Sequence, residues 1–306
     1  MNDFAKLKKM LGDDLMENIN LSEYTTMKVG GPAKLFFIAR SIEDLIRSVS
    51  LCRTEKIDFI VIGGGSNIIV NDKGYNGLVI LNRASNIAFL RDKSQVIVDS
   101  GVSLMRLITE SANRDYGGLE GLYGIPGTVG GAVYGNAGAH GTEICSLIKS
   151  ITVLTPENKI ARYKKEWLDP AYRLTKLKKM KKLGKNIPII LSVTFQLTRH
   201  KKEEIMRKLK EHISLRYEKQ PYDKPSAGSI FKNIGADKEK TAGYILESVG
   251  AKKLKIGGAE VSKKHANFVI NANHANSTEI KELIEEMRSL AHDKFGVELE
   301  EEVEFI

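Results

Sequence analysis

The sequence predicts a mixed α/β protein of about two domains, and three observations support this prediction. The chain has 306 residues, and domains contain about 150 residues each. Apolar residues make up 42% and charged residues 28% of the chain, a globular composition that excludes disordered and collagen-like proteins. Segments with a helical apolar period alternate with short β-rich segments, so helices and strands are expected to be interleaved.

The first third of the chain shows this alternation clearly. Ser41 precedes an apolar pattern of helical period that ends near Glu55, and Asp44 stands three residues after this candidate N-cap. A further helix is expected over residues 103–113. β-branched residues between glycine and polar residues predict strands at 57–62, 77–81 and 95–98.

The second half of the chain predicts another α/β unit. A strand is expected at 188–197, followed by helices at 203–217 and 241–249. Asn276 can cap a last helix with Glu279 at its third position. This helix should pack on a sheet through one apolar stripe, formed by Ile280, Leu283, Ile284, Met287 and Leu290. The closing residues 297–305 are too acidic for a strand that is buried on both faces.

Several classes of protein are excluded at this stage. No apolar run approaches the ~20 residues that cross a bilayer, and the first residues lack a signal-peptide core, so we expect a soluble, cytoplasmic protein. Cys52 and Cys145 lie far apart without metal-ligand spacing, which argues against disulfides and standard zinc sites. Both cysteines should be small buried hydrophobic residues, and no metal is expected.

The positive charge is concentrated in one segment. The net charge is +9, yet residues 162–185 alone contain ten Lys or Arg against Glu166 and Asp169. Such a segment can be a solvated surface loop, a funnel for small anionic substrates, or a polyanion-binding site. No helix-turn-helix, aromatic RNA-binding signature or zinc finger favours nucleic acid, so no nucleic-acid partner is expected.

Two glycine-rich loops have the composition of phosphate-binding loops. Gly63, Gly64 and Gly65 follow a predicted strand and precede Ser66 and Asn67, so successive backbone N–H groups can form an anion nest. Neither a Rossmann fingerprint nor a Walker A motif fits. A second loop spans residues 124–132 and is followed by Asn136, Ala137 and Gly138. Two such loops suggest one large ligand that contains a pyrophosphate.

These loops, in this order, resemble the FAD-binding segments of the UDP-N-acetylenolpyruvoylglucosamine reductase family. The upstream residues 25–33 are similar to the family's opening motif, and the block Ser226-Ala227-Gly228-Ser229-Ile230-Phe231-Lys232-Asn233 extends the match. The resemblance spans about residues 20 to 305. By this resemblance, the residues expected to bind FAD are Gly63, Gly64, Gly65, Ser66, Asn67, Ile125, Pro126, Gly127, Thr128, Gly130, Gly131, Ala132, Asn136, Ala137 and Gly138.

The resemblance implies a vanillyl-alcohol-oxidase-like (PCMH-type) FAD-binding fold. Two α/β subdomains, at residues 1–85 and 86–199, would hold the flavin, and a C-terminal α+β domain at 200–306 would bind substrate. The implied cofactor is noncovalent FAD, and the implied partners are NADPH and UDP-N-acetylglucosamine enolpyruvate. The chain is expected to be a monomer that acts in peptidoglycan precursor synthesis.

The implied reaction requires three roles. NADPH reduces the flavin, which then delivers hydride to the enolpyruvyl alkene, and the product is UDP-N-acetylmuramate. Negative charge develops beside the carboxylate, which a guanidinium such as that of Arg173 can stabilise. Ser229 matches the family's proton donor, and Glu302 matches the glutamate that helps to stabilise or protonate the enol.

Each assignment has a purely structural alternative. Arg173 can be a surface arginine of the basic segment, and Ser229 can simply end a turn after Gly228. Glu302 stands beside Glu300 and Glu301, and a solvated acidic tail is the other reading. Glu301 also occupies the place of the family's usual proline.

Other positions match or depart from the family's pattern. The chain lacks a long insertion between Arg173 and Lys219, so it resembles the shorter (type II) subtype, in which Tyr172 can reach the substrate diphosphate. His140 stands where tyrosine is commoner, and Thr175 keeps the hydroxyl of the usual serine. The residues expected to bind substrate are Tyr172, Lys219, Gly228 and Asn233, and His265 and Asn267 either line the same domain or flank a strand.

Two other functions remain open on the sequence alone. The first is a different FAD oxidase or dehydrogenase of the same fold, which would need no nucleotide-sugar site. The second is a colourless polyanion-binding protein centred on residues 162–185. Flavin absorbance at roughly 450 nm would exclude the second function, and turnover of the enolpyruvyl substrate would exclude the first.

Overall fold

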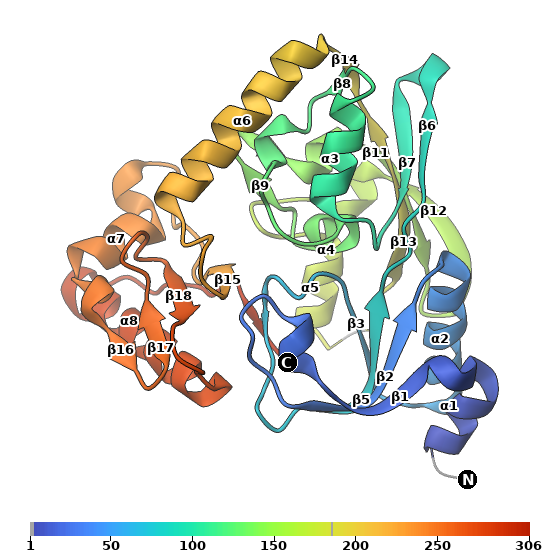
Figure 1. Cartoon of the computed structure of the whole chain (residues 1–306), viewed down its shortest axis with the longest axis horizontal. Helices are drawn as coiled ribbons and strands as arrows, with labels where there is room; N and C mark the ends of the chain where they lie inside the picture. The colour runs from blue at the N-terminus through green and yellow to red at the C-terminus, as the bar shows by residue number, and fades with distance from the viewer. Residues whose placement is uncertain (1–2, 185) are drawn as a thin grey trace. The chain divides into compact units, whose positions relative to one another are not determined.

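The structure is a computed structural model that describes residues 3–184 and 186–306. The chain forms two compact units, each built from more than one stretch of sequence. The first unit comprises Leu35–Gly64, Gly77–Ser214 and the N-terminal residues up to Met16. The second comprises Glu17–Lys34, Gly65–Asn76 and Leu215–Ile306. Both units mix helices and strands, which confirms the predicted α/β class (Figure 1).

A five-stranded antiparallel sheet forms much of the first unit. Its strand order is β12 (Ile160–Lys164), β11 (Ile148–Leu154), β13 (Ile189–Gln196), β7 (Gln95–Asp99) and β6 (Ile87–Leu90). Period-two alternation gives this sheet one apolar face, and helices α3 (Leu104–Ala112) and α4 (Val129–Tyr134) lie on one side of it (Figure 1). The shared core includes Val98, Val193, Phe195, Leu107 and Val133.

A second sheet, most of whose residues belong to the first unit, has the strand order β1 (Leu15–Asn20), β2 (Pro32–Ala39), β5 (Tyr75–Asn82) and β3 (Phe59–Ile62). Helix α2 (Ile42–Glu55) begins as predicted, because the Ser41 side chain accepts the Asp44 N–H at 3.0 Å. Strands β3 and β5 are parallel, and the segment that joins them contains the first glycine loop and the short strand β4 (Ile68–Ile69). A core that includes Leu45, Val49, Leu78 and Ile80 joins α2 to this sheet, beside helix α1 (Asp3–Leu11).

The second unit has a four-stranded antiparallel sheet in the order β15 (Ser226–Ser229), β18 (Phe268–Asn271), β17 (Ala259–Val261) and β16 (Lys255–Ile256). Helices α7 (Ala242–Ser248) and α8 (Ser277–Phe295) complete its core. The predicted capping box is present, since Asn276 and Glu279 exchange side-chain to backbone hydrogen bonds. The predicted stripe residues Ile280, Leu283, Ile284 and Met287 are buried.

The remaining elements are short or connect these layers. Helix α6 (Lys202–Lys219) carries the chain from the first unit into the second, and helix α5 (Lys176–Lys182) orders part of the basic segment. Lys185, the last residue of that segment, lies outside the described residues. Three small pairings involve β8 (Tyr116–Gly117) with β14 (Thr198–Arg199), β9 (Gly138–Ala139) with β10 (Thr142–Glu143), and β4 (Ile68–Ile69) with β19 (Glu304–Phe305).

Among the described residues, no helix combines the length and apolar character needed to span a membrane. The finer division at residues 85 and 199 stays a prediction.

The two cysteines are buried, as the sequence predicts, and burial raises the pKa of each thiol to about 12. Because the thiolate is the reactive species, native protein at pH 8 should react with Ellman's reagent at least about 100-fold more slowly than free cysteine. Unfolding in guanidinium should release both thiols. A rapidly titrating thiol in native protein would contradict this packing.

Candidate functional site

The two predicted glycine loops touch each other within the first unit. Gly63 and Gly64 follow β3, and Gly127 precedes α4. A Cβ built on Gly64 would lie 2.7 Å from the Gly127 Cα atom, and one on Gly63 would lie 2.2 Å from the Thr128 Oγ1 atom. Real Cβ atoms do not approach backbone this closely, so side chains are excluded here and the two loops meet backbone to backbone.

Some backbone N–H groups at this junction have no partner within the protein. Within residues 3–184 and 186–306, the N–H groups of Gly64, Gly127 and Thr128 donate no hydrogen bond. The next N–H groups along the chain are already used, because Gly130 donates to the Ser100 carbonyl at 2.8 Å and Gly131 to the Thr128 hydroxyl at 3.4 Å. The unused donors and the lack of side chains fit a phosphate-bearing cofactor held by backbone.

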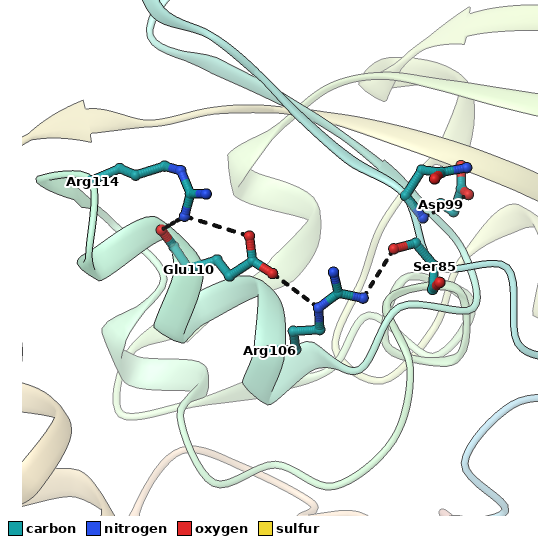
Figure 2. Close-up of polar contacts among 6 residues, drawn as sticks. Ser85, Asp99, Arg106, Glu110 and Arg114 are labelled. Atoms are coloured by element: carbon teal, nitrogen blue, oxygen red, sulfur yellow. Dashed lines mark hydrogen bonds and ion pairs between the residues drawn. The ribbon is translucent and has the colours of Figure 1, made fainter.

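Helix α3 is hydrogen-bonded to the second glycine loop. The Leu104 N–H donates to the Gly127 carbonyl at 3.0 Å. Figure 2 shows how α3 is fixed: Arg106 bridges the Glu110 carboxylate at 2.9 Å and the Ser85 carbonyl at 3.0 Å. Asp99 accepts the Asn86 N–H at 2.9 Å in the neighbouring turn, and burial raises the pKa of its carboxyl. These contacts leave the loop little freedom to shift.

Asn136, one of the residues predicted to bind FAD, uses its side chain for hydrogen bonds within the protein. It is buried, with φ of 46°, and its amide donates to the Glu143 carboxylate and the Ala171 carbonyl, each at 2.9 Å. Its side-chain oxygen accepts the Cys145 N–H at 3.3 Å. Because the amide makes these three bonds, Asn136 ties the loop to the turn that begins at Ala171.

That turn places Arg173 against the same loop. Ala171 and Leu174 exchange backbone hydrogen bonds of 2.9 and 3.0 Å, which leaves Tyr172 and Arg173 at the two central positions. The Arg173 guanidinium donates to the Gly138 carbonyl at 2.9 Å, so this residue is not an unattached surface arginine. Tyr172 is 44% exposed, and its ring centre lies 5.1 Å from the Arg173 Cζ atom.

In the second unit, Ser229 lies in a segment held on both sides. The Ile230 N–H donates to the Asn267 carbonyl at 2.9 Å on the β18 side. On the other side, the Glu302 N–H donates to the Ile230 carbonyl at 2.7 Å. Ser229 and Glu302 therefore occupy neighbouring segments, although they are far apart in the sequence. Gly228, with φ of 81°, provides the turn just before Ser229.

The end of the first glycine loop joins this arrangement. The Asn67 amide donates to the Glu302 carbonyl at 2.9 Å, and the Asn67 carbonyl accepts the Glu304 N–H at 3.0 Å. A Cβ built on Gly228 would lie 4.0 Å from the Ser66 carbonyl oxygen. The structure thus brings Ser66, Asn67, Gly228 and the chain around Ser229 and Glu302 together in one unit. Arg173 belongs to the other unit.

Comparisons with known proteins agree with both parts of the site. Residues 33–164 match the FAD binding domain family, and residues 220–306 match the C-terminal domain of UDP-N-acetylenolpyruvoylglucosamine reductase. The reductase of Anoxybacillus flavithermus is 36% identical over 95% of this chain and 93% of its own. The reductase of Carboxydothermus hydrogenoformans is 36% identical over 99% of each chain. The chain belongs to the UDP-N-acetylenolpyruvoylglucosamine reductase family.

A solved structure supports the same conclusion. The UDP-N-acetylenolpyruvylglucosamine reductase of Thermus caldophilus superimposes with a TM-score of 0.78 at 32% identity, covering 94% of this chain and 97% of the other. Membership of the reductase family makes the chain an FAD-dependent oxidoreductase of peptidoglycan precursor synthesis, with a PCMH-type FAD-binding fold and the family's C-terminal domain. Among the described residues, no cluster of His, Cys, Asp and Glu could hold a metal ion.

The three adjacent glutamates of this reductase-family chain have different surroundings. The Glu300 carboxylate pairs with Lys232 at 2.7 Å, and the Glu301 carboxylate pairs with Arg288. Both carboxylates therefore serve ion pairs that hold the C-terminal segment. Glu302 lies between Glu301 and the buried Val303, and its backbone bonds to Asn67 and Ile230.

Two residues hold the Ser229 segment in position, and one of them, Asn267, flanks strand β18, which is one of the two alternatives expected from the sequence. The Asn267 amide accepts the Phe231 N–H at 2.9 Å and donates to the Phe231 carbonyl at 2.8 Å, so it clamps the Ser229 segment. Thr26 donates to the Ser226 carbonyl at 2.7 Å. Thr26 lies in the 25–33 motif, which was the sequence signal for its role. The hydrogen bonds between Asn267 and Phe231 depend on a tertiary pairing that sequence spacing does not reveal.

The predicted substrate residues outside these clusters are placed as follows. Lys219 is exposed at the last position of α6. The Asn233 side chain accepts the Ala242 N–H at 3.1 Å at the start of α7. The predicted flavin-loop residues Ile125 and Ala137 pack partly buried against the core, together with the buried Ala132.

The close approach of the loops predicts a sensitive substitution. Gly64→Ala should force the loops apart and lower flavin retention in purified protein by about tenfold, since overpacking of close contacts costs about 1–3 kcal/mol. The measurement is the ratio of flavin absorbance to protein absorbance.

Gly135→Ala is the matched control, because its Cβ would lie 3.7 Å from the nearest atom, in ordinary contact. It should keep the flavin content of the unmodified protein. Equal flavin content in the Gly64 and Gly135 variants would contradict the proposed role of the loop junction.

Proposed function

We propose that this protein reduces UDP-N-acetylglucosamine enolpyruvate to UDP-N-acetylmuramate with NADPH, and that Ser229, Arg173 and Glu302 perform the chemistry on the substrate. The main support is the arrangement in the second unit. There the backbone of Ile230, next to Ser229, bonds the backbone of Glu302, and Asn67 of the glycine loop bonds the same glutamate. A proton donor and a carboxyl group are thus fixed on neighbouring segments.

FAD, bound without a covalent link, would supply the hydride that reaches the terminal alkene carbon. The backbone donors of Gly64, Gly127 and Thr128 would hold its pyrophosphate, because they are unused within the described protein. The glycines and the Asn136–Gly138 loop would shape the rest of the binding surface.

Arg173 would stabilise the charge that develops on the substrate carboxylate. Its guanidinium has five donor N–H groups, and one of them is used on the Gly138 carbonyl at 2.9 Å. This bond holds the guanidinium beside the loop that is proposed to bind the flavin. Removal of one such charge-stabilising donor costs about 3 kcal/mol, or roughly a hundredfold in rate.

Ser229 would deliver the proton, and Glu302 would stabilise the enol. The substrate carbanion is basic enough for a hydroxyl to act as its acid, and general acid catalysis contributes about 10²–10⁴ in rate. The clamp formed by Asn267 restricts the segment in which Ser229 lies, so the hydroxyl needs little reorganisation before transfer.

The finer assignments extend the proposal. We place the chain in the shorter, type II subtype, in which the exposed Tyr172 contacts the substrate diphosphate together with Lys219, Gly228 and Asn233. We also propose a cytoplasmic monomer. Sedimentation of the purified flavoprotein would test the oligomeric state.

Ser229→Ala separates the two half-reactions. NADPH should still bleach the flavin at the normal rate, because this step needs no proton from Ser229. Reoxidation by the enolpyruvyl substrate should slow by about 10²–10⁴. Anaerobic stopped-flow measurement of flavin absorbance distinguishes the two steps.

The control for this experiment is Ser248→Ala on α7, whose hydroxyl bonds the Tyr244 carbonyl at 2.9 Å. It makes the same chemical change in the same unit and should leave both half-reactions unchanged. Equal slowing of both half-reactions in the Ser229 variant would remove the proton-donor role.

Glu302→Gln tests the choice among the three glutamates. We expect the oxidative half-reaction to slow by roughly a hundredfold, since the variant loses an ionisable group at the enol. Glu300→Gln and Glu301→Gln are matched controls, because both carboxylates already serve ion pairs. They should lower the melting temperature without a comparable loss of rate. A larger rate loss in either control would reassign the role.

A further inference from the structure

Strand β12 forms one edge of the five-stranded sheet and has free backbone groups. It pairs only with β11, and the Thr155 N–H donates to the Lys159 carbonyl at 2.8 Å in the turn that joins the two strands. Hydrogen-bonded and non-hydrogen-bonded pairs alternate along antiparallel strands. The N–H and C=O groups of Ile160, Arg162 and Lys164 therefore point away from β11. In the part of the chain that the structure describes, these groups form no backbone hydrogen bond.

A cationic groove of about 650 Å³ lies beside this edge. Its lining contains four basic residues and a single acidic one, Glu166. No described residue forms an ion pair with the three lysines of the groove. The basic residues are Lys149, Arg162, Lys164 and Lys165.

The cations stand on the face of the sheet that is opposite the core. Arg162 aligns with Thr152, and Lys164 aligns with Ser150, across β12 and β11. The Arg162 guanidinium donates twice to the Ser150 hydroxyl, at 3.0 and 2.9 Å, which holds it along the sheet surface. The groove thus contains one cation, Arg162, that is held by hydrogen bonds to the sheet, and three lysines.

One aromatic residue, Tyr163, lines the groove, and its ring is already engaged within the protein. Tyr163 packs partly buried against the core, and its ring stacks on Trp167 at 4.4 Å. Single-stranded nucleic acid is bound by basic grooves in which aromatic rings are available to stack on bases. Since the Tyr163 ring is already stacked on Trp167 and packed against the core, the charges of the groove favour an acidic peptide over nucleic-acid bases.

We propose that β12 docks an extended acidic segment of a partner protein, which adds a strand to the sheet. The unpaired backbone groups would give the main-chain hydrogen bonds of strand addition. Asp or Glu at alternate positions of that segment would lie on the same face as Arg162 and Lys164, as cross-strand charge pairing requires. This surface is separate from the flavin and substrate residues and explains part of the concentrated positive charge of residues 162–185.

The test uses the full-length flavoprotein and a fluorescent peptide of Glu-Val repeated four times, followed by anisotropy. We expect saturable binding that weakens at least tenfold in the double variant Arg162→Glu, Lys164→Glu. The matched control is Lys201→Glu, Lys202→Glu, which reverses two exposed charges elsewhere in the first unit and should change affinity less than twofold. Normal flavin content and turnover in both variants would show that they are folded.

Further probes separate strand addition from simple charge attraction. The same peptide, with N-methyl groups on alternate backbone amides, keeps its charge but cannot pair, and it should bind at least tenfold more weakly. An oligothymidylate of eight nucleotides and phosphatidylglycerol vesicles should also bind more weakly than the unmodified peptide. The proposal is overturned if the unmodified peptide fails to bind, or if the methylated peptide, the oligonucleotide or the vesicles bind equally well.

Discussion

The backbone contact between Gly64 and Gly127 is the constraint on which the proposed flavin-binding part of the site depends. A Cβ atom on Gly64 would lie 2.7 Å from the Gly127 Cα atom, so only the hydrogen of glycine fits at this position. The loops can meet because each is held by a neighbouring element: the first directly follows β3, and the second is hydrogen-bonded to the start of α3. The absence of side chains lets the two loops approach each other and also leaves backbone N–H groups without protein partners. These N–H groups are the ones that we propose bind the phosphates.

In the second unit, the segments that we propose act on the substrate are held in place by a different means. No glycine junction is needed there, because the Ser229 segment is bonded on one side to β18 and on the other to the C-terminal segment. Ion pairs of Glu300 and Glu301 hold that segment in place. Two of the three adjacent glutamates thus have structural ion pairs, and the third, Glu302, is the one that we propose acts on the substrate.

The sequence predicted correctly those features that depend on residues close together in the chain. The caps at Ser41 and Asn276 and the apolar stripe of α8 depend on neighbours within one or two turns, and the structure has all three. The family motifs located the glycine loops and the Ser229 block. Strands β1 and β2 were not anticipated, because their pairing partners lie far along the chain. For the same reason the sequence did not predict the bond from Asn136 to Ala171 or the clamp made by Asn267, because these partners are set by tertiary pairing.

The second unit is built from three separated stretches of sequence, and this affects how it can fold during translation. Residues 17–34 and 65–76 leave the ribosome long before residues 215–306, which complete their core and include Leu299 and Val303. Such non-local closure slows folding and leaves apolar surface exposed in the interval. Met27, Val29 and Ile69 must therefore stay unaggregated during most of translation, which makes the nascent chain a natural client for chaperones that shield short apolar segments.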